Sequence, residues 1–227
     1  MSGVTLYLIL AGIPMLIGAF AQFSLRSAVK AGNLSPTELT GEQAARQMLD
    51  HAGLQTVNIE RVSGFLTDHY DPSAKVLRLS AAVYDQANAT AVGVACHEAG
   101  HAIQDATHYA PLVIRNIAVP AASIGSNFGI GMFMVGMFLS WGSLIWMGII
   151  LFSLVVLFQI INLPVEFNAS SRAKAFLYNM NFVNEEGASR VRAALYAAAM
   201  TYVAATVQAI GTLCYYIMLA ASQRRSE

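Results

Sequence analysis

The chain has 227 residues, of which 13 are basic and 13 acidic, so its formal net charge is zero. Such a balance gives no reason to expect nucleic-acid binding, which usually comes with an excess of basic side chains. Hydrophobic residues make up 56% of the sequence and charged residues only 11%, against about a quarter in soluble domains, so the composition favours a helical membrane protein over a soluble globular one.

The first apolar segment covers residues 4–23 and contains no Lys, Arg, Asp or Glu. Its length matches the roughly 20 residues that a helix needs to cross a hydrocarbon core of about 30 Å. Ala19-Phe20-Ala21 resembles a signal-peptidase site, but no basic residue precedes the segment as it would in a signal peptide. We therefore predict a retained transmembrane helix within residues 1–23.

Residues 24–114 form a polar segment, the only one long enough for a small folded domain. Its first helix has two alternative starts with capping patterns, Ser-Pro-Thr-Glu at residues 35–38 and Thr-Gly-Glu-Gln at residues 40–43. From either start, the helix would continue through Leu49 and end near Gly53, because glycine is common just beyond helix C-termini.

Three short strands are predicted next, at residues 56–62, 64–67 and 76–80. The last two flank residues 69–75, whose Asp-Pro-Ser core is typical of a turn. Together they predict a hairpin or a three-stranded sheet, and the strand at 76–80 could pair with an extended substrate by strand addition. From about Ala82 a helical pattern continues without a break to Thr107.

This last helix carries the sequence His-Glu-Ala-Gly-His at residues 97–101. Residues four apart lie on one face of a helix, so His97 and His101 can bind one zinc ion, and Glu98 beside them can reach a water molecule at that ion. Small residues such as Gly100 allow other segments to pack closely around the motif. We interpret it as the core of a zinc-peptidase site; the alternative is a pair of structural histidines on a surface helix.

Two further apolar segments follow at residues 117–139 and 142–163, joined by a turn at Ser140-Trp141. A pair of crossings returns the chain to the side on which the His-Glu-Ala-Gly-His helix ends. Glu166 comes directly after the second crossing, so topology places its carboxylate near the two histidines as the best candidate for the third ligand. Ser170 lies one turn further on and could orient a ligand. Alternatively, Glu166 is an interfacial carboxylate paired with Arg172.

A helical segment at 164–194 leads to the fourth apolar segment, residues 195–221, and to a short tail at 222–227. With four crossings, eleven of the 13 basic residues lie on the side of the polar segment, and only Arg224 and Arg225 lie on the other. Basic residues close to membrane spans favour the cytoplasmic side. We therefore expect residues 24–114 to face the cytoplasm and both termini to lie outside.

Four stretches carry a family resemblance: HEAGHAIQ at 97–104, LTDHYDP at 66–72, LS…VY at 79–84 and PVEFNASSRA at 164–173. From about residue 40 to residue 173 the chain resembles the bacterial membrane neutral zinc metallopeptidases of the YugP type. The resemblance implies a multi-pass protein of the bacterial inner membrane with a small α+β, zincin-like catalytic domain. It also implies His97, His101 and Glu166 as zinc ligands and Glu98 as the catalytic residue. The family pattern has Asp where this chain has Asn168, which leaves a hydrogen-bonding amide in place of a charge.

The predicted fold is thus mainly α, with four transmembrane helices, and the predicted function is a zinc-dependent endopeptidase that cuts membrane or membrane-proximal proteins. Glu98 would move a proton from water to the leaving amine, and one more donor would stabilise the oxyanion. Side chains that could be this donor or orient a ligand are Tyr84, His69, His108, Tyr178, Arg172, Asn168 and Ser170. The expected partners are a protein or peptide substrate and the lipid bilayer, with no nucleic acid.

Two other functions fit part of the sequence. A non-catalytic, zinc-binding membrane scaffold would have a fourth protein ligand, for example His69 or His108, and would not need Glu98. An intramembrane protease would carry its motif inside an apolar span, whereas this helix contains Gln104 and Asp105. Cys96 and Cys214 lie too far apart in sequence and surroundings to predict a disulfide, and Cys96 is interpreted as a packing residue.

Overall fold

The computed structural model describes residues 3–64, 67–180 and 182–223, most of which are helical. The chain divides into two compact units. The first consists of Met1–Ala21, Ile114–Leu163 and Thr201–Glu227, and the second of Gln22–Val113 and Pro164–Met200. Arg224 and Arg225, on which part of the topology prediction rests, lie outside the described residues.

Four helices within the described residues are long and apolar enough to cross a membrane: Thr5–Asn33, Ala110–Phe138, Gly142–Asn179 and Glu185–Gln223. The first comprises the end of α1 (Gly3–Tyr7), a π-helical turn η1 (Leu8–Gly12) and α2 (Ile13–Asn33). The second comprises α6 (Ala110–Ile124), a π-helical turn η2 (Gly125–Gly129) and α7 (Ile130–Phe138). The third is α8 (Gly142–Asn179) and the fourth is α9 (Glu185–Gln223). The four predicted spans lie inside these helices, apart from one residue at an end of each of the first two.

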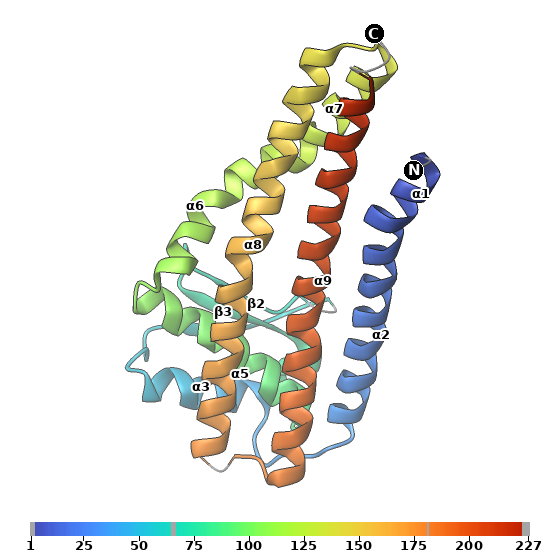
Figure 1. The fold of residues 1–227 in the computed structure, drawn as a ribbon. Coiled ribbons are helices and arrows are strands. Elements are labelled where there is room, and N and C mark those ends of the chain that lie inside the picture. Colours follow the sequence, from blue (N-terminus) through green and yellow to red (C-terminus); the bar gives the residue numbers. More distant parts are fainter. Residues whose placement is uncertain (1–2, 65–66, 181, 224–227) are drawn as a thin grey trace. The chain divides into compact units, whose positions relative to one another are not determined.

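The helices of the first unit pack through small residues. Phe133 of α7 and Ile145 and Ile149 of α8 share a core with Ala220 of α9, and Figure 1 shows these helices side by side. A Cβ atom added to Gly136 would lie 2.7 Å from the backbone nitrogen of Ile145, so the two backbones meet where side chains are missing. Such contacts are characteristic of helix pairs in membranes.

In the second unit, α3 (Gly41–His51) begins at the second of the two predicted starts. The Thr40 hydroxyl accepts a hydrogen bond from the backbone nitrogen of Gln43, and the Gln43 side chain accepts one from the backbone nitrogen of Thr40. The helix ends before Gly53, whose φ of +76° is accessible to glycine at little cost. The alternative start is wrong, because Pro36 lies in an extended bridge with Asn88.

The sheet has three strands, β1 (Asn58–Val62), β2 (His69–Asp71) and β3 (Val76–Ser80), in the order β1-β3-β2. The strand predicted at residues 64–67 is wrong at its two ends, because neither Gly64 nor Thr67 lies in a strand. Its other two residues, Phe65 and Leu66, lie outside the described part of the chain. The second strand instead starts at His69, within the predicted turn. Substrate pairing is also excluded along Val76–Arg78, because β3 is paired there with β1 on one edge and with β2 on the other.

The helix predicted from Ala82 to Thr107 is interrupted. A short α4 (Ala81–Tyr84) ends before α5 (Ala89–Ala106), because Asn88 is extended and its side chain caps the backbone nitrogen of Ala91. In Figure 1, α3 and α5 lie beside the sheet, with the lower parts of α8 and α9. The buried core of this unit comes from all of these elements and includes Leu49, Leu77, Leu79, Val92, Cys96, Ala173 and Val191. Cys96 is therefore a packing residue, and both cysteines are free.

Candidate metal centre

The two histidines of the motif lie one turn apart on α5 and face the same side. Their rings are 4.8 Å apart between centroids and almost perpendicular, at 87°. Both side chains are largely buried, with 13% of His97 and 11% of His101 exposed. The helix therefore presents two imidazoles to one point, as the i, i+4 spacing predicts.

Glu166 reaches this point from α8, because α5 and α8 touch through their backbones. A Cβ atom added to Gly100, between the two histidines, would lie 2.9 Å from the carbonyl oxygen of Ala169. Glu166 lies one turn before Ser170 on α8 and is only 3% exposed. Its Oε2 atom is 3.3 Å from His97 Nε2 and 3.8 Å from His101 Nε2. The proximity expected from topology is therefore confirmed.

The donor atoms of these three residues fit a zinc ion. They all lie within 4.8 Å of one another. Ligand atoms around a tetrahedral zinc with bonds of about 2.0–2.2 Å are roughly 3.4 Å apart, close to the distances between Glu166 and the two histidines. Two imidazole nitrogens and a carboxylate oxygen are also a ligand set typical of catalytic zinc.

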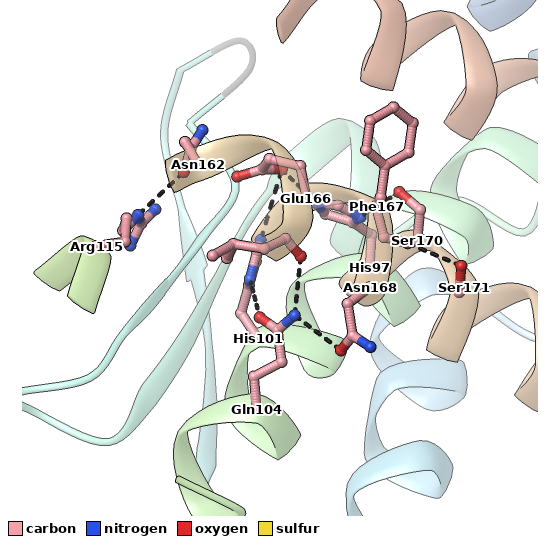
Figure 2. A network of polar contacts seen from close by, with 11 residues as sticks. His97, His101, Gln104, Arg115, Asn162, Glu166, Phe167, Asn168, Ser170 and Ser171 are labelled. Carbon is pink, nitrogen blue, oxygen red and sulfur yellow. Dashed lines mark hydrogen bonds and ion pairs between the residues drawn. The ribbon is translucent and has the colours of Figure 1, made fainter. Parts of the chain in front are cut away.

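The other ring nitrogens are held by the protein, which turns both Nε2 atoms toward Glu166. His97 Nδ1 is 3.1 Å from the hydroxyl oxygen of Ser170, and His101 Nδ1 is 2.9 Å from Oε1 of Gln104. Figure 2 shows that these contacts come from opposite sides of the pair. Zinc-binding histidines are commonly oriented in this way through their second nitrogen. The orienting position predicted for Ser170 is thus present.

Gln104 is the residue that sequence reasoning missed at this site. Its amide nitrogen donates to the carbonyl oxygen of Val165 at 2.8 Å and to Oδ1 of Asn168 at 3.0 Å. Arg172 Nε donates to the same Asn168 oxygen at 2.8 Å, so Arg172 bonds Asn168 and forms no ion pair with Glu166 among the described contacts. The available signal was a polar residue three positions after His101, on the same helix face.

Glu98 lies beside the cluster in an environment that favours its neutral form. Burial, strengthened by the negative charges of Glu166 and Asp68, raises the pKa of its carboxyl group to about 7, although His97 and the backbone nitrogen of Tyr70 act in the opposite direction. A carboxyl group with a pKa near neutrality can both accept and release a proton.

Burial lowers the pKa of His97, but its hydrogen bond with Glu166 and the charges of Glu98 and Glu166 outweigh that effect and raise it overall. The cluster therefore favours positive charge at the position where the three donor atoms meet.

The contacts of the described residues place none of the remaining candidates in this cluster. Tyr70 contacts Asp105 of α5 through its hydroxyl group, so its neighbour His69 points to the opposite face of β2. Tyr178 lies twelve residues after Glu166 on the same helix, about 18 Å along its axis. His108 follows the C-terminus of α5, and Tyr84 packs partly buried against the hydrophobic core. The donor for the oxyanion therefore stays unassigned among the predicted residues.

Two comparisons find proteins similar to this chain. Residues 7–221 match the family described as "Putative neutral zinc metallopeptidase". The chain is also similar to the "Putative membrane protease YugP" of Bacillus subtilis (strain 168), with 43% identity over 180 residues, which cover 79% of this chain and 80% of that protein. No solved structure matches the chain significantly.

Proposed function

We propose that the chain, which belongs to this family of neutral zinc metallopeptidases, is an endopeptidase that hydrolyses peptide bonds of membrane or membrane-proximal proteins. It is a membrane protein, and its cofactor is zinc. The observation that carries the proposal is the convergence of His97, His101 and Glu166 on one point, with Glu98 adjacent on α5. The α5 helix together with the small sheet would make up a zincin-like catalytic domain.

His97, His101 and Glu166 would hold the zinc ion. When bound there, zinc supplies a Lewis acid that acidifies water and polarises a carbonyl group. Glu98 accepts a proton from the attacking water and passes it to the leaving amine, and its raised pKa suits both steps near neutral pH. Ser170 and Gln104 keep the two imidazoles in place while the charges change.

A purely structural zinc site is less well supported. Within residues 3–64, 67–180 and 182–223, three His, Cys, Asp or Glu side chains gather at this point, and neither His69 nor His108 joins them. Three protein ligands leave a coordination position open for water, as catalytic zinc sites do. A scaffold would also have no use for Glu98.

Cleavage within the membrane is likewise disfavoured. The His-Glu-Ala-Gly-His sequence lies on α5, which is not among the four membrane-length helices found in the described residues. We therefore propose that the peptidase reaction takes place outside the hydrocarbon core, and the basic residues near the spans favour the cytoplasmic side of a bacterial inner membrane.

The decisive variant is Glu98→Gln, which removes the proton acceptor and keeps the shape of the side chain. In detergent, the wild-type chain should hydrolyse fluorescently labelled casein and lose this activity with 1,10-phenanthroline. We expect Glu98→Gln to retain one zinc per chain, measured by metal analysis, and to cleave casein at least about 100-fold more slowly. Cleavage by the variant at the wild-type rate would refute the role of Glu98.

A matched control is Glu38→Gln, the same change in the loop before α3. Its activity and zinc content should equal those of the wild type.

Acetohydroxamate, a small metal chelator, should shift the absorption spectrum of the cobalt-substituted wild type because it needs an open coordination position. An unchanged spectrum would favour the closed site of a scaffold.

A further inference from the structure

Gln104 is completely buried and uses both the oxygen and the nitrogen of its amide in hydrogen bonds. None of its side chain is accessible to solvent. Its oxygen faces His101 Nδ1, and its nitrogen donates to both Val165 O and Asn168 Oδ1. Both amide hydrogens are thus used, and each partner lies on an element that carries a candidate zinc ligand: His101 on α5, and Val165 and Asn168 on either side of Glu166 on α8.

The guanidinium group of Arg172, at the end of this network, fixes the direction of each hydrogen bond in it. A guanidinium group can only donate, so Asn168 must present its oxygen to Arg172. That same oxygen faces Gln104, which must therefore present its nitrogen, as the carbonyl oxygen of Val165 also requires. A flipped Gln104 amide would place its oxygen against two acceptors.

We propose that Gln104 is a positioning residue that holds His101 with the proton on Nδ1, and that Asn168 and Arg172 fix the orientation of its amide. With Nδ1 donating to Gln104 Oε1, the lone pair of Nε2 is directed toward Glu166 and the metal position. The two hydrogen bonds to α8 also keep Glu166 in register with the histidines of α5. The inference rests on the proposed zinc site and adds the residues that orient one of its ligands.

The expected effect of losing this network is on metal affinity. Partners that orient zinc ligands typically contribute about 10- to 100-fold to affinity. Replacing Gln104 by Leu keeps the volume but leaves the Nδ1 proton of His101 without its acceptor and α8 without two donors. We expect a similar loss, about 10- to 100-fold, in zinc affinity of the full-length protein in detergent, measured by competition with a chromophoric chelator.

A matched control exists in the first unit. Gln208 is half-buried on α9 and bonds Thr212 on the same helix, so Gln208→Leu makes the same substitution away from the cluster. Zinc affinity should stay at the wild-type value in this variant. The spectrum of the cobalt-substituted protein should change in Gln104→Leu and not in Gln208→Leu, because only the former alters a ligand's orientation.

Asn168 supplies a second, independent pair of variants if Gln104→Leu does not fold. Asn168→Asp keeps an oxygen acceptor for both Gln104 and Arg172, so zinc affinity should remain within about threefold of the wild type. Asn168→Leu removes that acceptor and should weaken zinc binding by about tenfold.

The outcomes separate the inference from the proposed function. Equal zinc affinities of wild type and a folded Gln104→Leu would overturn the inference while leaving the zinc site intact, as would equal losses in Asn168→Asp and Asn168→Leu. A wild-type chain that binds no zinc would instead overturn the proposed function.

Discussion

Glu166 is the residue on which the assignment of a catalytic zinc site depends most. Its Oε2 atom lies near both histidine Nε2 atoms, and no other carboxylate, imidazole or thiolate in the described chain joins that group. We expect Glu166→Ala to bind zinc at least about 100-fold more weakly, since it leaves two ligands where catalytic sites have three. Metal content after dialysis against a weak chelator measures this. Glu186→Ala, an exposed carboxylate on α9 that pairs with Arg190, is the control.

Zinc retained by Glu166→Ala at the level of the control would remove Glu166 as the third ligand. The pair of variants also distinguishes the interfacial alternative, in which Glu166 would pair with Arg172. In the structure Arg172 bonds Asn168 instead, so Arg172→Met should weaken zinc binding far less than Glu166→Ala does.

At the residue scale, the sequence was most informative where chemistry depends on local spacing. His97, Glu98 and His101 follow from the i, i+4 geometry of one helix. Glu166 required a topological argument as well. Gln104 could not be predicted, because its role depends on Val165 and Asn168, which lie 61 and 64 residues away.

Among the elements, α5 and α8 determine where the ligands meet, and their contact depends on the missing side chain of Gly100. A methyl group there would press on the backbone of Ala169, which cannot move without shifting Glu166 and Ser170. Gly100→Ala should therefore weaken zinc binding by about tenfold or more, although alanine favours helices by about 1 kcal/mol over glycine. Competition with a chelator measures the affinity.

Gly93 provides the comparison on the same helix. The nearest neighbour of a Cβ atom at Gly93 would be the side chain of Val191, at 3.3 Å, which can give way. Gly93→Ala should keep its zinc affinity and gain or retain thermal stability. Equal affinities in Gly93→Ala and Gly100→Ala would show that the close crossing of α5 and α8 does not position the ligands.

The turn between β2 and β3 has its own pH dependence. The backbone nitrogen of Ala74, together with the guanidinium group of Arg78, lowers the pKa of Asp71 to about 2 from its ordinary value of 3.8. A lowered pKa stabilises the fold above the unfolded-state value, and this contribution disappears as pH falls from about 4 to 2. Asp71→Asn lacks it at every pH. The difference in thermal midpoint between wild type and variant should therefore shrink from pH 5 to pH 2; a constant difference would contradict the assignment.

Element boundaries were predicted less well than element types, for identifiable reasons. The break between α4 and α5 depends on Asn88, which caps the start of α5. The residues on both sides of Asn88 have a helical pattern, so the sequence predicted one continuous helix. In the sheet, β1 pairs in parallel with β3, so the strand adjacent in sequence is not the neighbour of β1. The predicted span ended at residue 163, yet α8 continues through Pro164 to Asn179. A proline inside a membrane-length helix is tolerated, so its presence does not locate a boundary.

On the scale of the whole molecule, the length and hydropathy of the apolar segments predicted the four membrane-length helices, because long uncharged segments have few other structures available. The helices nevertheless extend well beyond the apolar segments. The α8 helix carries Glu166, Ser170 and Arg172, and α9 begins ten residues before the predicted span. Hydropathy marks what enters the hydrocarbon core and gives no signal for the polar continuation of the same helix.

The orientation of the chain in the membrane is the last prediction. Basic residues near the spans predict that the candidate metal centre faces the cytoplasm, so the turn at Ser140, between α7 and α8, should lie outside and Glu38, before α3, inside. Single cysteines at these positions can be tested in a Cys214→Ala background, because Cys96 is buried and burial raises the pKa of its thiol. In spheroplasts, a membrane-impermeant maleimide should label Ser140→Cys directly and Glu38→Cys only after lysis, while the Cys214→Ala background stays unlabelled. The reverse pattern would place the metal centre outside the cell and with it the proteins that the peptidase could reach.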